Sequence, residues 1–275
     1  MLGKRIITAV IGIPIAIYII HYGAWLFTAA IVALAVIAWH EFYQMMQAKN
    51  IKVQYGFGLI GVIFALGCIG LGNGQEVTMV ILLVVLLAMV KAVISHTAYG
   101  MTDAAFTVLG TLYVSLPFSH LLLLRFTAQC EYIPTALGAL PAGAAYLWLA
   151  FLGTWASDTF AYFVGSMLGR HKLCPAISPG KTLEGAAGGL VGSILGVAAI
   201  GGLIGLPLIH SLIIGLLVGI AAPLGDLVES ALKRFAGVKD SGNILPGHGG
   251  VLDRFDAIMF SVPVVYYYIR TFLLA

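Results

Sequence analysis

The chain has 275 residues, of which 61% are hydrophobic and 9% are charged, and its mean hydropathy is +1.04. Ordinary soluble domains carry about 25% charged residues, so the composition excludes that class and indicates an integral membrane protein. The net charge of +3 suits the anionic lipid headgroups at a cytoplasmic surface, and nothing in it indicates a nucleic-acid partner.

Long apolar runs follow one another along nearly the whole chain. A transmembrane helix needs roughly 20 mostly apolar residues, and nine runs, give or take one, approach or meet that length: 6–21, 23–40, 57–72, 77–95, 104–124, 143–165, 184–204, 207–225 and 255–274. The runs are continuous and do not alternate, which predicts helices rather than a β-barrel. We therefore predict an all-α, polytopic integral membrane protein that forms a single domain over residues 1–275, with N-terminal spans in 1–134 and a catalytic half in 135–275. The region 135–165 is too long for one simple span.

The basic residues predict the orientation of these spans. Lys4 and Arg5 precede the first run and favour an uncleaved signal anchor, with a cleaved signal peptide as the alternative. If the N-terminus is cytoplasmic, twelve of the fourteen Lys and Arg residues lie on the cytoplasmic side, and Arg125 and Arg270 do not. The polar segments 170–184 and 226–256 are then cytoplasmic as well.

Asp158 is an acidic residue inside an apolar run. A carboxylate there is costly without a partner, which makes it a candidate site residue. A hydrogen bond to Ser157 or Thr159 is the purely structural alternative.

The loop at 169–189 contains a pattern that imitates a nucleotide-binding motif. Gly180, Lys181 and Thr182 match the end of a Walker A sequence, but Pro175 stands where the motif requires glycine, which excludes a P-loop. Ser178, Lys181 and Thr182 then have two interpretations. They begin and cap a helix, or they form a phosphate clamp with the helix N-terminus. The three cysteines, Cys68, Cys130 and Cys174, are too scattered to indicate a disulfide framework or a zinc site.

Charged residues are concentrated near the C-terminus, where residues 226–256 hold nine of the 25 in the chain. Asp226 and Glu229 share one helix face, and an interfacial helix with a pair between Glu229 and Lys233 is the alternative to a site. Pro223 predicts a kink just before Asp226. An acid at such a kink near the membrane boundary favours a bound cation.

The loop that follows combines glycines, a histidine and two further acids. Gly247, Gly249 and Gly250 surround His248 and can bring backbone N–H groups to an anion, although a turn without a ligand explains them equally well. Asp253 and Asp256 begin the last run on one face, with helix capping as the alternative. Together with Asp226 and Glu229 they bracket one loop, and they converge if the two flanking spans pack together. Magnesium suits such oxygen ligands.

The residues now match a family. The segment "SALKRFAGVKDSGNILPGHGGVLDRFD" (230–256) resembles the signature of the phosphatidate cytidylyltransferases, or CDP-diacylglycerol synthases, and "SPGKTLEG" and "SDTFAYFVG" resemble other polar segments of that family. Gly180 departs from the Lys or Asn of the family pattern. The resemblance covers the C-terminal half, while the N-terminal spans match only in character.

The resemblance implies transfer of a cytidylyl group from CTP to phosphatidic acid, with magnesium required and a second cation allowed, in a bacterial inner membrane. The lipid phosphate is already an ionised nucleophile, so alignment and charge neutralisation limit the reaction. We expect Asp226, Asp253, Lys233 and Arg234 to be catalytic and Asp226, Asp253 and Asp256 to hold the metal. Substrates are expected to contact Ser178, Lys181, Thr182, Lys239, Asp240, His248, Arg254 and Asp158.

Two other functions stay open at this point. Another lipid-phosphate transferase or a lipid kinase would need the same groups. A cation-coupled transporter also uses acids and broken helices, but it would concentrate its acids near the middle of the membrane. The sequence leaves a homo-oligomer open.

Overall fold

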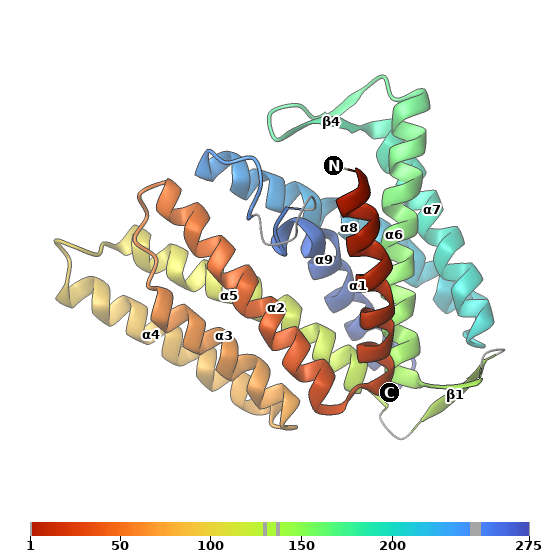
Figure 1. Ribbon diagram of the computed structural model, residues 1–275, viewed down its shortest axis with the longest axis horizontal. Helices are drawn as coiled ribbons and strands as arrows, with labels where there is room; N and C mark the ends of the chain where they lie inside the picture. Colours follow the sequence, from red (N-terminus) through yellow and green to blue (C-terminus); the bar gives the residue numbers. More distant parts are fainter. Residues whose placement is uncertain (1, 129–130, 136–137, 243–248, 275) are drawn as a thin grey trace. The chain divides into compact units, whose positions relative to one another are not determined.

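The computed structural model describes the chain except for residues 1, 129–130, 136–137, 243–248 and 275, and for residues 2–9 and 11 it describes the backbone alone. The described chain is mainly helical, as predicted (Figure 1). Its helices are α1 Leu2–Tyr22, α2 Ala24–Ala48, α3 Tyr55–Gly70, α4 Val77–Ile94, α5 Met101–Phe126, α6 Ala142–Leu168, α7 Leu183–Leu203, α8 Leu208–Ala236 and α9 Leu252–Phe272, with the 3-10 turn η1 Gly74–Glu76 before α4.

Five helical segments of the described chain are long and apolar enough to cross a membrane: Ala24–Ala48, Gly74–Ile94, Met101–Phe126, Leu183–Leu203 and Leu208–Ala236. Gly12–Tyr22 and Tyr55–Gly70 are apolar but shorter. The prediction of an all-α membrane protein is therefore confirmed, and the count of nine spans stays a prediction. Helix α9 lies outside this set, and it carries Asp253, Arg254, Asp256 and Arg270.

Two short hairpins were not predicted. Strands β1 Tyr132–Thr135 and β2 Gly138–Pro141 pair antiparallel just before α6, which explains why 135–165 is too long for one span. Strands β3 Lys172–Cys174 and β4 Ser178–Thr182 pair antiparallel between α6 and α7. Helix α8 runs through Pro223 into the charged segment.

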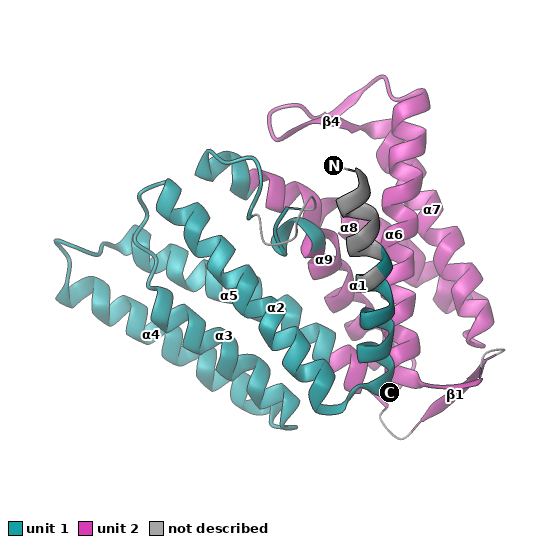
Figure 2. Ribbon diagram, viewed as in Figure 1, with its two compact units in different colours: residues 1–122, 232–254 teal, residues 123–231, 255–275 magenta. Residues whose placement is uncertain are grey.

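The contacts divide the chain into two compact units (Figure 2). Unit 1 comprises residues 1–122 and 232–254, and unit 2 comprises 123–231 and 255–275. Each unit combines two stretches that are separated in the sequence.

Unit 1 packs helices around aromatic side chains of α2. Trp39 and Phe42 are fully buried and stacked on each other, and the Trp39 indole N–H donates to the Tyr55 carbonyl at 3.0 Å. A Cβ atom at Gly58 would lie 2.0 Å from the Trp39 ring, and one at Gly110 would lie 2.1 Å from Phe42. The glycines therefore allow α3 and α5 to pack against these rings.

Unit 2 is held by small residues at helix contacts. Glycines of α7 lie against α6: a Cβ at Gly188 would be 2.5 Å from Val164, and one at Gly192 would be 2.4 Å from Phe160. Helix α8 approaches α9 at Gly225, where a Cβ would lie 2.3 Å from the Asp256 carbonyl oxygen. Small residues at such contacts let helix backbones approach closely, which is a common packing mode in membranes.

We expect Gly225→Ala to lower the thermal unfolding midpoint of the purified protein. The added methyl group meets a backbone atom that cannot rotate away, and overpacking of this kind costs about 1–3 kcal/mol. Gly202→Ala is the matched control, because a Cβ at Gly202 meets nothing within 4 Å. Equal midpoints for the two variants would contradict the close α8 and α9 contact.

Candidate functional site

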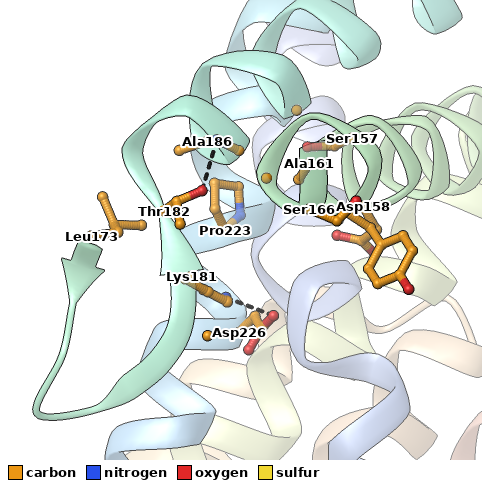
Figure 3. Close-up of a pocket in the computed structure, with 15 residues that line it drawn as sticks. Ser157, Asp158, Ala161, Ser166, Leu173, Lys181, Thr182, Ala186, Pro223 and Asp226 are labelled. Carbon is orange, nitrogen blue, oxygen red and sulfur yellow. Dashed lines mark hydrogen bonds and ion pairs between the residues drawn. The ribbon is translucent and has the colours of Figure 1, made fainter. Parts of the chain in front are cut away.

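A cavity of about 380 Å³ lies in unit 2, at the level of the β3 and β4 hairpin. Its walls come from α6, the hairpin, α7 and α8 (Figure 3). The polar lining residues are Ser157, Asp158, Tyr162, Ser166, Lys181, Thr182 and Asp226. Three of the predicted substrate residues and one predicted metal ligand therefore lie on one cavity.

The hairpin is anchored at its base by Glu184. The carboxylate of Glu184 accepts hydrogen bonds from the backbone N–H groups of Arg170 at 3.1 Å and His171 at 3.2 Å, and lies 2.6 Å from His171 Nδ1. Thr182 caps α7, since its hydroxyl accepts from the Gly185 N–H at 3.1 Å. These bonds fix the position of the strand that carries Lys181.

Lys181 and Asp226 face each other in the cavity (Figure 3). Lys181 Nζ lies 2.6 Å from Asp226 Oδ2, and Ser230 Oγ donates to Asp226 Oδ1 at 3.4 Å. The charge of Asp226 acts on Asp158 and on Asp256 as well. Asp226 thus pairs with Lys181, and its negative charge repels those of Asp158 and Asp256.

A second polar cluster lies in unit 1, around Asp253 at the start of α9. Asp253 Oδ1 lies 2.6 Å from Lys233 Nζ. Asp253 Oδ2 accepts from the backbone N–H groups of Ser241 and Gly250 and from the Ser241 hydroxyl, each at 2.9 Å. Gly249 has a φ of +82° and a Cβ there would lie 2.7 Å from Asp253 Oδ2, so this position requires glycine.

A depression beside this cluster carries further cations. It has a volume of about 350 Å³ and is lined by Arg234, Gly237, Val238 and Lys239. Asp240 and Arg254 are exposed in the same unit. Two of the cations predicted to contact phosphates therefore line one shallow surface.

Several sequence interpretations need correction. The helix start predicted for Ser178, Lys181 and Thr182 is right only for Thr182, which ends β4 and caps α7, whereas Ser178 and Lys181 lie in the strand before the helix. Ser178 does not line the cavity. The structural alternative for Asp158 is not supported, because no hydrogen bond to Ser157 or Thr159 occurs in the described part of the chain.

The four predicted carboxylates occupy different surroundings. Asp226 and Asp256 belong to unit 2, where Glu229 is also buried, whereas Asp253 belongs to unit 1. Among the described residues, no three His, Cys, Asp or Glu side chains form a ready-made metal site. His248 lies outside the described residues.

Sequence reasoning missed Glu41. This residue of α2 is 1% exposed, and its carboxylate accepts hydrogen bonds from the backbone N–H groups of Val251 at 2.8 Å and Leu252 at 2.9 Å. Glu41 directly follows the predicted apolar run 23–40, whereas Asp158 lies inside its run, so Glu41 did not stand out as an acid within an apolar segment.

Comparison with known proteins now bears on this arrangement of residues. Residues 3–272 match the model of the Cytidylyltransferase family. The chain belongs to this family. The match includes the N-terminal spans, where the sequence alone offered no motif.

Bacterial relatives cover nearly the whole chain. A phosphatidate cytidylyltransferase of Bacillus subtilis is 35% identical over 279 residues, which cover 98% of either chain. A phosphatidate cytidylyltransferase of Staphylococcus aureus strain COL is 36% identical over 271 residues, covering 95% of this chain and 96% of the relative. One of Staphylococcus epidermidis is 35% identical over 278 residues, with the same coverage.

Proposed function

We propose that this chain transfers the cytidylyl group of CTP to phosphatidic acid, giving CDP-diacylglycerol and pyrophosphate. A phosphate oxygen of the lipid attacks the α-phosphorus of CTP, and the bond from that phosphorus to the oxygen bridging to the β-phosphorus breaks. The electron pair leaves with pyrophosphate. Membership of the Cytidylyltransferase family and the names of its relatives support this reaction.

The cavity in unit 2 is the observation that carries the proposal. It places a lysine and carboxylates together beside a capped helix N-terminus. A triphosphate needs cations and N–H donors, and a metal ion that accompanies it needs oxygen ligands. The cavity supplies a lysine from β4 and carboxylates from α6 and α8.

The acidic cluster fits a magnesium ion. Magnesium is usually held by one or two protein carboxylates together with substrate phosphates, so a ready-made site of three side chains is not required. Asp226 and Asp256 would hold it, with Asp158 nearby, and the charges of all three act on one another. The ion would offset the repulsion between the two reacting phosphate groups. A second cation stays within the proposal.

Asp253 fits a different role from the metal ligand predicted from the sequence. Unlike Asp226, it does not line the cavity, and its Oδ2 oxygen accepts hydrogen bonds from two backbone N–H groups of unit 1 while Oδ1 accepts from Lys233. We assign it the task of holding Lys233, which then faces phosphate together with Arg234, Lys239 and Arg254. Asp240 and His248 stay proposed substrate contacts.

The cytoplasm is the side on which CTP is found, and we place the site there. The positive-inside distribution of Lys and Arg supports the same placement. A mixed-micelle assay of pyrophosphate release tests the reaction. The purified protein should release pyrophosphate with CTP and phosphatidic acid and not with ATP and the same lipid. Transfer of the γ-phosphoryl group of ATP to the lipid would indicate a lipid kinase instead.

We expect Lys181→Ala to raise KM for CTP about 10- to 100-fold, because a charge-assisted hydrogen bond to phosphate is worth about 1.5–3 kcal/mol. Lys172→Ala is the matched control, since Lys172 is an exposed lysine of the same hairpin. Steady-state kinetics at saturating lipid measures both variants. If Lys181→Ala and Lys172→Ala have the same KM, Lys181 does not contact the nucleotide.

A further inference from the structure

Glu41 is a buried acid that the reaction described above does not use. It lies on α2, in unit 1, and is 1% exposed. Burying a carboxylate in an apolar helix is costly unless hydrogen bonds compensate for the lost water. Its contacts are therefore informative.

The partners of Glu41 among the described residues are about 200 positions away in the sequence, in the segment before α9. Oε1 accepts from the Val251 N–H at 2.8 Å, and Oε2 accepts from the Leu252 N–H at 2.9 Å. Those N–H groups belong to the start of α9, where backbone donors lack partners within the helix. Neither Val251 nor Leu252 has a side chain that can cap a helix. Glu41 supplies the cap from another helix.

Ser241 connects Glu41 to Asp253. The Ser241 hydroxyl lies 3.2 Å from Glu41 Oε2 and 2.9 Å from Asp253 Oδ2. Asp253 in turn lies 2.6 Å from Lys233 Nζ. A continuous set of polar contacts within unit 1 thus runs from Glu41 on α2 to the cation at the end of α8.

The glycines of this segment close tightly on Glu41. A Cβ at Gly242 would lie 2.7 Å from Glu41 Oε1, and one at Gly250 would lie 2.6 Å from the same oxygen. A Cβ at Gly250 would also lie 2.3 Å from the Ser241 hydroxyl. Gly242 and Gly250 therefore pack closely against this carboxylate, and a larger residue at either position would displace it.

We infer that Glu41 is a positioning residue for cytidylyl transfer: by binding the N–H groups of Val251 and Leu252 at the start of α9, it keeps Asp253 in place and so orients Lys233 toward phosphate. The inference rests on the proposed function. It requires the negative charge of Glu41, because both oxygens must accept hydrogen bonds. A glutamine has one acceptor oxygen and presents an NH2 group to the other donor.

The test compares Glu41→Gln with Glu41→Asp, which keeps the charge on a side chain shorter by one methylene. We expect Glu41→Gln to lower kcat for pyrophosphate release about 10- to 100-fold, the range found when outer groups that orient a site are removed. KM for CTP should change little, and Glu41→Asp should recover part of kcat. Turnover is expressed per CTP-binding site, measured by equilibrium binding, so that unfolded protein does not count.

Glu76→Gln is the control, because Glu76 is an exposed acid of unit 1. If wild type and Glu76→Gln are active and Glu41→Gln has the wild-type kcat per binding site, the inference is wrong while the proposed function stands. If the wild-type protein itself does not release pyrophosphate from CTP, both the inference and the proposed function are wrong. Should Glu41→Gln fail to fold, Gly242→Ala carries the test, since its added methyl group would displace the Glu41 carboxylate without removing the charge. A wild-type kcat per binding site in Gly242→Ala would then overturn the inference.

Discussion

Asp226→Asn should reduce pyrophosphate release from CTP and phosphatidic acid by about 100- to 1,000-fold, the loss found when one preorganised electrostatic group is removed from an active site. Asparagine has nearly the same shape as aspartate, so the cavity should keep its form. What changes is charge. The variant loses the partner that lies 2.6 Å from Lys181, and the acidic cluster loses the member whose charge acts on both others.

A magnesium titration separates a metal role from a purely electrostatic one. If Asp226 holds the ion, Asp226→Asn should need a higher magnesium concentration for half-maximal rate, in addition to its lower maximal rate. The control is Glu131→Gln, which removes one charge from an exposed position of unit 2. Near-normal turnover in a folded Asp226→Asn variant would remove Asp226 from the site. If turnover falls but the magnesium dependence is unchanged, Asp226 belongs to the site but does not hold the metal ion.

The helical fold and the chemistry were predictable from different kinds of signal. Apolar run length identified the membrane helices, because the thickness of a bilayer sets the length of a span. The fixed spacing of Lys233, Asp253 and their neighbours identified the family. The segment 178–182 was predicted to be a polar phosphate clamp, which stays a prediction, and the structure places Lys181 and Thr182 on the cavity.

The hairpins and Glu41 were not predicted, for physical reasons. Each strand of the hairpins has five residues or fewer, too short to establish an alternating pattern. Glu41 acts on residues about 200 positions away, and no local pattern in the sequence records such a contact. Helical spacing placed Asp253 and Asp256 on one face, yet their surroundings differ, because the bonds of Ser241 and Gly250 to Asp253 depend on a loop conformation.

Two kinds of acid in this chain therefore lie in different surroundings. Asp226 and Asp158 line a cavity and are accessible to a ligand. Asp253 and Glu41 accept hydrogen bonds from backbone N–H groups at and just before the start of α9. Replacing a carboxylate that binds backbone N–H groups should change the stability of the protein as well as its turnover. Variants of Asp253 and Lys233 allow both quantities to be measured.

Asp253→Asn and Lys233→Met should each lower the thermal unfolding midpoint and abolish most turnover, whereas the double variant should regain stability without regaining turnover. The two side chains are 10% and 15% exposed, and removing one partner of a nearly buried ion pair costs about 3–5 kcal/mol because the other charge is left uncompensated. Replacing both partners removes that penalty. The lost cation, however, cannot be replaced by methionine when the phosphates react.

The measurement is a double-mutant cycle, with midpoints and kcat taken from the same detergent-purified samples. The double variant should be much more stable than the sum of the two single effects predicts, since the residues are in direct contact. Recovery of turnover along with stability in the double variant would mean that the pair only holds the fold. If the double variant is no more stable than the single ones, the ion pair is not the main contact of either side chain. If the double variant regains stability but not turnover, Lys233 contacts the substrate and Asp253 holds Lys233 in position.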